Sequence, residues 1–465
     1  MYTLYNAPRT VITAKPMKIQ PISGMGGVLG DEVGDSHHAE HSNTRQPMLA
    51  SDLVTELQSL LPMLWVNPGE RVVDDPIDPE HVGLAEQRLQ RAAPLLARVI
   101  PELAGSDGII ESPLLDASAL RDVLGGQSRW LFKADNRLPL AGSVKARGGI
   151  HEVLEFAEKT ALAHGWDGED YSELASPAWR AVFAEHSLVV GSTGNLAISI
   201  GLMARALGFQ AQVHMSGEAA GWKKDLLREQ GVEVIEHPGD YATAVDTGRR
   251  CAADNPKAHF VDDEQSMSLF CGYATAARRL AVQLQQLGIE VSRQRPLMVY
   301  LPCGVGGAPG GITYGLKQVF GDAVHCWFAE PLASPSVLLQ MAAGMHGKVS
   351  VYDVGLDNRT FADGLAVGQA SMLATACLQD RLAGVFTVGD SALTYYLKVA
   401  WEMLGEKIEP SAAASFAGPG WVTSSPAGFE WSRRHQIDLE AATHLLWSTG
   451  GNLVPDELFQ QWLAI

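Results

Sequence analysis

Cysteine, long apolar runs and positive charge are all scarce in this sequence. Only five of its 465 residues are cysteines, and no two form a CxxC pair. This pattern favours reduced thiols in the cytoplasm over a disulfide framework. No run of about eighteen apolar residues occurs, so we expect no membrane span. Lysine and arginine number 35 against 53 acidic residues, and the net charge of −18 argues against nucleic acid, whose phosphates would be repelled.

The first 48 residues show neither helical nor strand periodicity. They also lack the apolar core of a secretory signal. We expect a disordered extension, or an upstream start with Met48 as the natural first residue, and a transit peptide is a third reading. The remaining chain, with 46% apolar residues overall, is long enough for two domains with a sizeable buried core.

From residue 49 onward, strand-like and helix-like segments alternate, which is typical of an α/β fold with parallel strands. Strands are predicted at 130–134, 188–190, 211–215, 232–236, 297–301, 326–329 and 444–447, and helices after Lys145, from 195 to Gly208, at 222–229 and at 312–320. The strand-helix repeat beginning near 187 predicts a small domain over 187–275. A large domain would then combine 49–186 and 276–465.

The richest glycine cluster, residues 302–311 (PCGVGGAPGG), follows a predicted strand and precedes a predicted helix. Glycines allow consecutive backbone N–H groups to converge on an anion, and a helix N-terminus adds favourable potential, so this segment can cradle a phosphate. It lacks the Gly-Lys-Ser/Thr of an ATP-binding P-loop, and no GxGxxG opens the first βαβ unit. A tight structural turn would explain the glycines equally well.

Three further segments carry polar groups at the ends of predicted strands. Lys145 lies among small residues between a strand and a helix, where desolvation would make its amine nucleophilic toward an aldehyde; the alternative is an ordinary surface lysine. Residues 191–195 (GSTGN) offer donors for a carboxylate, or a simple helix cap. Residues 448–451 (STGG) place a hydroxyl that could meet a ring nitrogen, or form only a turn.

Taken together, these segments resemble the fold-type II pyridoxal-phosphate enzymes, the group of tryptophan synthase β and the serine/threonine dehydratases. The similarity is closest to the D-serine dehydratase family, in segments 143–149, 190–196, 220–224, 261–264, 300–307 and 361–368. These follow the same order throughout, from about Met48 to the C-terminus. The resemblance implies large and small open-sheet α/β domains with pyridoxal 5′-phosphate between them.

The resemblance also implies roles for individual residues. Lys145 would bind the cofactor aldehyde and later carry the Cα proton. The 5′-phosphate would be held by Gly304, Val305, Gly306 and Gly307, the ring 3′-oxygen by Asn195 and the pyridine nitrogen by Thr449. The substrate carboxylate would be bound by Ser192, Thr193 and Gly194. Thr193 and Asp263 would hold the substrate hydroxyl or relay protons, although a structural cap or salt bridge is an equal reading of Asp263.

The implied reaction is deamination of D-serine by elimination of water, giving pyruvate and ammonia, with D-threonine to 2-oxobutanoate as a second conversion. A neutral hydroxyl from Thr449 would leave the ring nitrogen largely unprotonated, which favours elimination over transamination. The alternatives are an L-serine or L-threonine dehydratase, another β-eliminating or β-replacing enzyme, and a non-catalytic phosphate-binding α/β protein.

The resemblance also implies a cation site, an oligomeric state and a partner, and it shows one departure from the family pattern. Glu330, beyond the predicted strand 326–329, would bind a monovalent cation, K⁺ or Na⁺. Relatives of this kind are monomers or homodimers, and the partner is a small amino acid. Ala308 replaces a glycine of the family pattern, which would weaken cofactor binding only if residue 308 had to adopt a positive φ.

Overall fold

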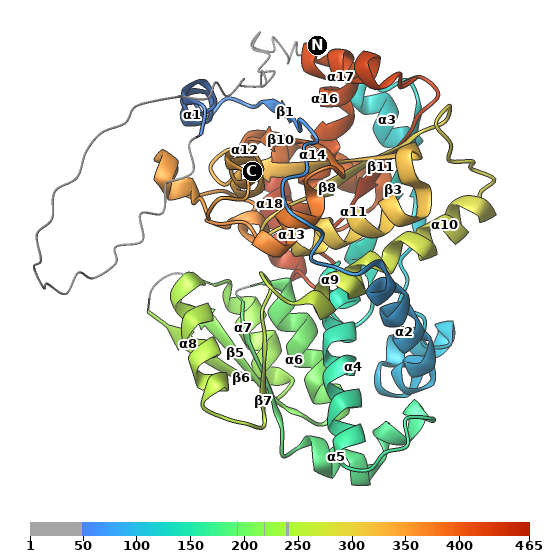
Figure 1. Ribbon diagram of the computed structural model, residues 1–465, viewed down its shortest axis with the longest axis vertical. Helices are drawn as coiled ribbons and strands as arrows, with labels where there is room; N and C mark the ends of the chain where they lie inside the picture. Colours follow the sequence, from blue (N-terminus) through green and yellow to red (C-terminus); the bar gives the residue numbers. More distant parts are fainter. Residues whose placement is uncertain (1–48, 193, 218, 239–240) are drawn as a thin grey trace, which may run out of the picture.

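Two β-sheets organise the protein. The computed structural model describes residues 49–192, 194–217, 219–238 and 241–465, so the predictions for the extension 1–48 and for Thr193 lie outside it. The first sheet has seven strands in the order β1-β10-β9-β8-β11-β3-β2, and the second has four in the order β6-β5-β4-β7. Figure 1 shows the four-stranded sheet below the seven-stranded one.

The seven-stranded sheet comprises β1 (Leu64–Val66), β2 (Leu114–Asp116), β3 (Arg129–Lys133), β8 (Leu297–Pro302), β9 (Val324–Pro331), β10 (Leu382–Val388) and β11 (Thr443–Trp447). Its inner strands β8 and β11 are buried along their whole length, as expected of parallel strands covered on both faces. The edge strands β1 and β2 pair antiparallel, a departure from the expected parallel arrangement. They are only three residues long and lie at the two edges, so they do not disturb the parallel centre.

Parallel pairing aligns the strand ends that carry the predicted site. β11 lies between β3 and β8 and pairs parallel with both. The carboxyl ends of the three strands therefore meet at one edge of the sheet, where open α/β sheets bind their ligands. The glycine cluster follows β8, residues 448–451 follow β11, and Lys145 lies twelve residues after the end of β3.

The four-stranded sheet is entirely parallel and comprises β4 (Ser187–Gly191), β5 (Gln210–Ser216), β6 (Glu233–His237) and β7 (Ala258–Val261). Helices α6 (Asn195–Leu207), α7 (Gly221–Glu229) and α8 (Tyr241–Ala253) flank it in Figure 1. As predicted, α6 ends at Gly208, which has a positive φ of 103°. Strand β7 was not predicted. The pairing shows that residues 187–261 form a sheet of their own; the division into two domains stays a prediction.

The other helices are distributed around the two sheets. They are α1 (Ser51–Gln58), α2 (Pro79–Val99), α3 (Ser118–Leu124), α4 (Lys145–Ala163), α5 (Pro177–Phe183), α9 (Met267–Ala274), α10 (Ala276–Gln286), α11 (Gly307–Phe320), α12 (Ser336–Ala343), α13 (Met372–Leu378), α14 (Asp390–Leu404), α15 (Pro410–Ala413), α16 (Gly418–Ser424), α17 (Pro426–His435) and α18 (Asp456–Ala464). Within the described ranges, no helix is both long and apolar enough to cross a bilayer. All five cysteines are free thiols.

A buried ion cluster fixes the start of α4 against the large sheet. Arg147 donates from Nε and Nη2 to the two oxygens of Asp135, each at 2.8 Å. Asp135, the second residue after β3, also accepts from the indole Nε1 of Trp447, at 2.8 Å. It therefore joins the end of β11 to the first turn of α4. Arg147 and Lys133 lower the pKa of Glu111 to about 2 although burial opposes them. The cluster therefore carries charge at neutral pH and holds the backbone of Lys145 in place.

We expect Arg147→Met to lower the free energy of unfolding by about 3–5 kcal/mol, because Asp135 would remain buried without its cation. Urea denaturation followed by circular dichroism measures this change. The matched control is Arg293→Met, which removes an ion pair to Asp322 whose two side chains are 73% and 72% exposed. It should change stability by less than about 1 kcal/mol. Equal effects of the two substitutions would contradict a special role for the buried cluster.

Candidate active site

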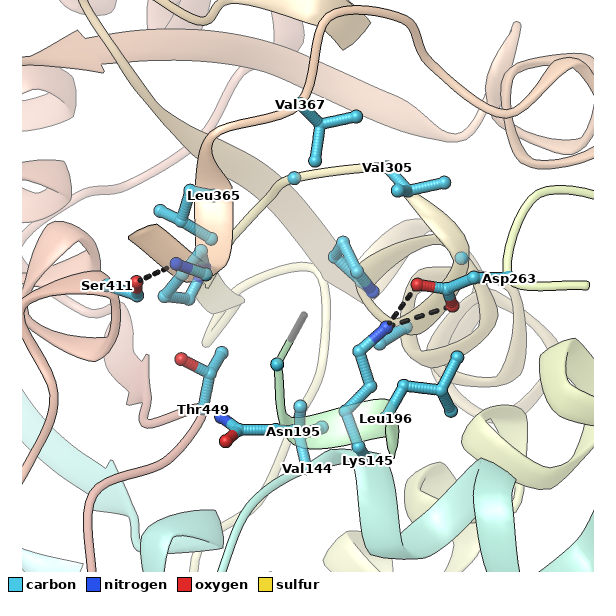
Figure 2. A pocket seen from close by; sticks show the side chains of 18 of the residues that line it. Val144, Lys145, Asn195, Leu196, Asp263, Val305, Leu365, Val367, Ser411 and Thr449 are labelled. Atoms are coloured by element: carbon cyan, nitrogen blue, oxygen red, sulfur yellow. Dashed lines mark hydrogen bonds and ion pairs between the residues drawn. The ribbon is translucent and has the colours of Figure 1, made fainter. Parts of the chain in front are cut away.

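One cavity brings together nearly all of the predicted site residues. Its lining includes Lys145, Ser192, Gly194, Asn195, Asp263, Gly304, Val305, Gly306, Gly307 and Thr449. Figure 2 shows Lys145 reaching toward Asp263, with Asn195 and Thr449 on the other side of the lysine side chain. Two predicted residues are not in this set. Thr193 is outside the described residues, and Glu330 does not line the cavity.

The glycine loop forms the N-terminal end of α11. Gly306 precedes the helix with a φ of 103°, a conformation that favours glycine. A Cβ on Gly307 would come within 3.2 Å of the main-chain oxygen of Asp263, so a side chain at this position would be tightly packed. The helix begins at Gly307 rather than at the predicted residue 312, because first-turn residues need no intrahelical N–H partner and tolerate Pro309. Their free N–H groups make this loop a suitable phosphate site.

Ala308 lies inside the first turn of α11, in right-handed helical conformation. The left-handed geometry that would have penalised alanine is therefore not required at this position. As expected, replacing the glycine keeps the N–H and adds no backbone strain.

Lys145 and Asp263 form an ion pair inside the cavity. The Nζ atom of Lys145 lies 2.9 Å from each carboxylate oxygen of Asp263, and the ring of Tyr273 lies 5.7 Å from the same Nζ. Asp263 does not cap the following helix, because the side chain of Ser266 accepts from the first turn of α9. The prediction that Asp263 caps a helix is therefore wrong. The alternative prediction of a salt bridge is confirmed, and its partner is Lys145.

Thr449 places an unpaired hydroxyl at the cavity. The main-chain oxygen of Thr449 accepts from Val144 N at 2.9 Å, which ties this loop to the residue before Lys145. The side-chain oxygens of Ser143, Ser448 and Thr449 are buried without a hydrogen-bond partner among the described residues, and of these three residues only Thr449 lines the cavity. A buried hydroxyl without a partner is costly, so the Thr449 hydroxyl fits a polar ligand. The free Thr449 hydroxyl suits a ring nitrogen, as the resemblance implies.

Residues 192 and 194 approach the cavity from the start of α6. The main-chain N–H of Ser192 donates to His214 O at 3.1 Å, and the N–H of Gly194 donates to the Ser192 hydroxyl at 3.3 Å. The first of these N–H groups is therefore already used within the sheet, whereas the second makes only a long local bond. A carboxylate here would be met by the Ser192 hydroxyl and the Gly194 N–H rather than by every N–H of the segment.

Three charged residues beside the cavity were not assigned roles from the sequence. Glu409 and Asp363 line the cavity, and Lys223 lies 3.3 Å from Asp363 and 4.0 Å from Glu409. Burial raises the pKa of Glu409, and Lys223 opposes this shift. Lys223 and Asp363 belong to family-like segments of the sequence, but Glu409 belongs to no motif. Only the tertiary structure brings Glu409 to the site.

Glu330 lies on β9 and is completely buried. Its two carboxylate oxygens accept main-chain N–H groups of Val337 at 2.8 Å and Leu338 at 2.9 Å, in the first turn of α12. Burial raises its pKa to about 8 although these donors oppose the shift. Across the described ranges, no group of three or more His, Cys, Asp or Glu residues is arranged to hold a metal ion.

Comparisons of this sequence with known proteins agree with one another. A "Pyridoxal-phosphate dependent enzyme" family model matches residues 105–423. A protein of Cupriavidus pinatubonensis named probable D-serine dehydratase is 54% identical over 423 residues, covering 90% of this chain and 95% of the relative. A protein of the same name from Burkholderia lata is also 54% identical, with coverage of 89% and 94%.

Among solved structures, diaminopropionate ammonia lyase from Escherichia coli matches with a TM-score of 0.67 at 19% identity, covering 86% of this chain and 96% of that one. Its complex with D-serine matches with a TM-score of 0.66 at 18% identity and the same coverage. At these identities the likeness concerns the fold, which is fold type II as the sequence suggested. With a family model spanning more than half of its length and relatives above 50% identity, this chain belongs to the pyridoxal-phosphate-dependent enzyme family.

Proposed function

We propose that this protein is a lyase that converts D-serine to pyruvate and ammonia. The observation that carries the proposal is the position of the Lys145 amine in one cavity with the glycine loop at 304–307. An amine and an anion cradle facing the same space are what a phosphorylated aldehyde requires. The choice of substrate is supported by relatives named probable D-serine dehydratase, which are 52–54% identical over about 90% of the chain. We extend the proposal to D-threonine, which would give 2-oxobutanoate.

The residues of the cavity suit the cofactor one by one. The N–H groups at 304–307 would hold the phosphate, Asn195 the 3′-oxygen, and the Thr449 hydroxyl the ring nitrogen. Lys145 would hold the cofactor at rest, and once the amino group of the substrate replaced the lysine, the cofactor would withdraw electrons from the Cα–H bond. Thr449 is neutral, so it does not favour a proton on the ring nitrogen. This arrangement favours elimination over transamination.

Lys145 and Asp263 are the groups placed to move protons. An amine released from the cofactor can take the Cα proton, and Asp263 lies within hydrogen-bond distance of that amine. We propose that Asp263, with Thr193, holds the substrate hydroxyl or relays its proton. Loss of the Cα proton and the β-hydroxyl removes one water. Hydrolysis of the released enamine returns one water, so the net products are pyruvate and ammonia.

A monovalent cation, K⁺ or Na⁺, at Glu330 belongs to the same proposal. This carboxyl is fully buried with no cation partner among the described residues, and its pKa is raised to about 8. A bound cation would offset the cost of burying the charged form. The main-chain oxygen of Gly304 lies 3.2 Å from the hydroxyl of Ser336, near the same carboxyl, and offers a hard oxygen ligand. We further propose that the protein acts in the cytoplasm as a monomer or homodimer.

The two serine enantiomers test the substrate directly. We expect the purified holoenzyme to release pyruvate from D-serine at least about a hundredfold faster than from L-serine, a difference of about 3 kcal/mol in transition-state binding. A coupled lactate dehydrogenase assay measures the pyruvate. Faster turnover of L-serine or L-threonine would instead make the protein a dehydratase of the L-enantiomers.

We expect Lys145→Ala to lower kcat with D-serine by at least about a thousandfold, because the covalent attachment and the proton carrier are lost together. Borohydride reduction followed by mass spectrometry should place the cofactor on Lys145 in the parent and nowhere in the variant. Unchanged circular dichroism would show that the fold survives. Near-parental turnover by the variant would refute the mechanism, and a parent without any reducible adduct would favour the non-catalytic alternative.

We expect K⁺ or Na⁺ to raise the melting temperature of the protein relative to choline at equal ionic strength, by a few degrees. In Glu330→Gln this difference should disappear, since the carboxylate that would hold the cation is absent. Differential scanning fluorimetry provides the measurement. Identical melting temperatures in all three salts for the parent would refute the cation site and leave Glu330 as a cap of α12.

A further inference from the structure

We propose that Glu409 is a positioning residue that sets the direction of the Asn195 amide toward the cofactor. This inference rests on the cofactor binding of the proposed function, and it assigns a residue to which no motif points. Asn195 Nδ2 donates to Glu409 Oε2 at 3.0 Å. A carboxylate can only accept, so it requires the NH₂ end of the amide, not the oxygen end, to face it.

The orientation matters because the two ends of an amide act oppositely on a ligand. The Nδ2 atom of Asn195 carries two protons, and Glu409 accepts a hydrogen bond from one of them. The second remains available to donate to the 3′-oxygen of the cofactor. If the amide turned over, its oxygen would accept there instead, which would favour a protonated 3′-oxygen. Glu409 thus selects which protonation state of the cofactor Asn195 stabilises.

The surroundings hold Glu409 firmly in this position. Its main-chain N–H donates to Gly450 O at 2.9 Å, next to Thr449. A Cβ on Gly450 would lie 2.7 Å from Asn195 Nδ2 and 3.2 Å from Glu409 Oε2. The side chains of Asn195 and Glu409 therefore meet beside Gly450, where the backbone carries no side chain. A Cβ on Gly451 would lie 2.6 Å from Glu409 N, which shows how closely the two backbone segments pack. Thr449, Glu409 and Asn195 therefore form one connected unit.

Lys223 supplies the countercharge for this unit. Its side chain is 3% exposed, as is that of Glu409, and their charged atoms are 4.0 Å apart. Burial would lower the pKa of Lys223, but Glu409 and Asp363 together raise it, so the lysine is charged. Burial raises the pKa of Glu409, and the cation of Lys223 opposes this shift and so favours the ionised form, which can only accept. Lys223 comes from α7 beside the small sheet, whereas Glu409 precedes α15, so the pair joins two segments that are far apart in the chain.

Glu409→Gln is the direct test. A glutamine of the same shape can present either its oxygen or its NH₂ group, so the Asn195 amide loses its fixed direction. We expect the visible absorption band of the holoenzyme, from the form with an unprotonated 3′-oxygen, to lose roughly half of its intensity to the near-ultraviolet band of the protonated form. Cofactor affinity, measured by fluorescence titration of the apoenzyme, should fall about tenfold.

The chain contains a matched control three residues away. Glu406 is 1% exposed, accepts from Asn136 Nδ2 at 2.8 Å and pairs with the cation of Arg137, but it does not line the cavity. Glu406→Gln should lower the melting temperature without changing the ratio of the two bands. A lower melting temperature with unchanged bands and affinity in Glu409→Gln as well would show a merely structural role and overturn the inference.

A second variant covers the case in which Glu409→Gln does not fold. Lys223→Met leaves Glu409 in place but removes its countercharge, which favours the protonated carboxyl and shifts the bands in the same direction. Unchanged bands in Lys223→Met would count against the inference. A parent that shows the visible band but does not convert D-serine would refute the proposed substrate alone. An active parent with band ratios and affinity unaltered by Glu409→Gln would refute only the role of Glu409.

Discussion

The parallel pairing of β11 between β3 and β8 is the constraint on which the site depends. Each strand brings a different functional segment to the same edge of the sheet, and the register fixes their separation. The buried contact of Arg147 with Asp135, itself bonded to Trp447, then locks the lysine-bearing helix to that edge. A reactive amine on a flexible loop would not keep a fixed direction. Lys145 instead begins helix α4, whose first turn is anchored to two strands.

Buried carboxylates in this protein behave differently according to what surrounds them. Glu111 is half-buried, faces Arg147 and Lys133 and keeps a low pKa of about 2, so it carries a charge at the rim of the buried cluster. Glu330 faces two main-chain N–H groups and the hydroxyl of Ser336, and burial raises its pKa to about 8 although these donors oppose the shift. Glu409 lies between these cases, with one buried lysine and one amide as partners. The same side chain thus acts as a structural anion, a candidate cation ligand or an orienting acceptor, depending on its neighbours.

The cavity lies where residues from both sheets meet. Lys145, Gly304 and Thr449 follow strands of the seven-stranded sheet, and Ser192 and Asn195 follow a strand of the four-stranded one. A ligand between them would contact both, and the contact of Lys223 with Glu409 and Asp363 already joins the two sides. A ligand bound in this cavity would therefore link the two sheets.

By itself, the sequence determined the local features. Continuous apolar runs predicted the buried strands, and Gly208 predicted the end of α6. The glycine cradle, Lys145 and Asn195 were predicted from motifs whose chemistry depends on neighbouring residues. It did not predict the antiparallel edges, the start of α11 at Gly307, or strand β7, because short strands and first helical turns have weak periodicity. Strand β10 was also not predicted, and its apolar run is interrupted by Gly384. Only the tertiary structure decided between a helix cap and an ion pair for Asp263 and brought Glu409 to Asn195, 214 residues away in the chain. Such contacts depend on how distant segments pack, and no local pattern of residues encodes them.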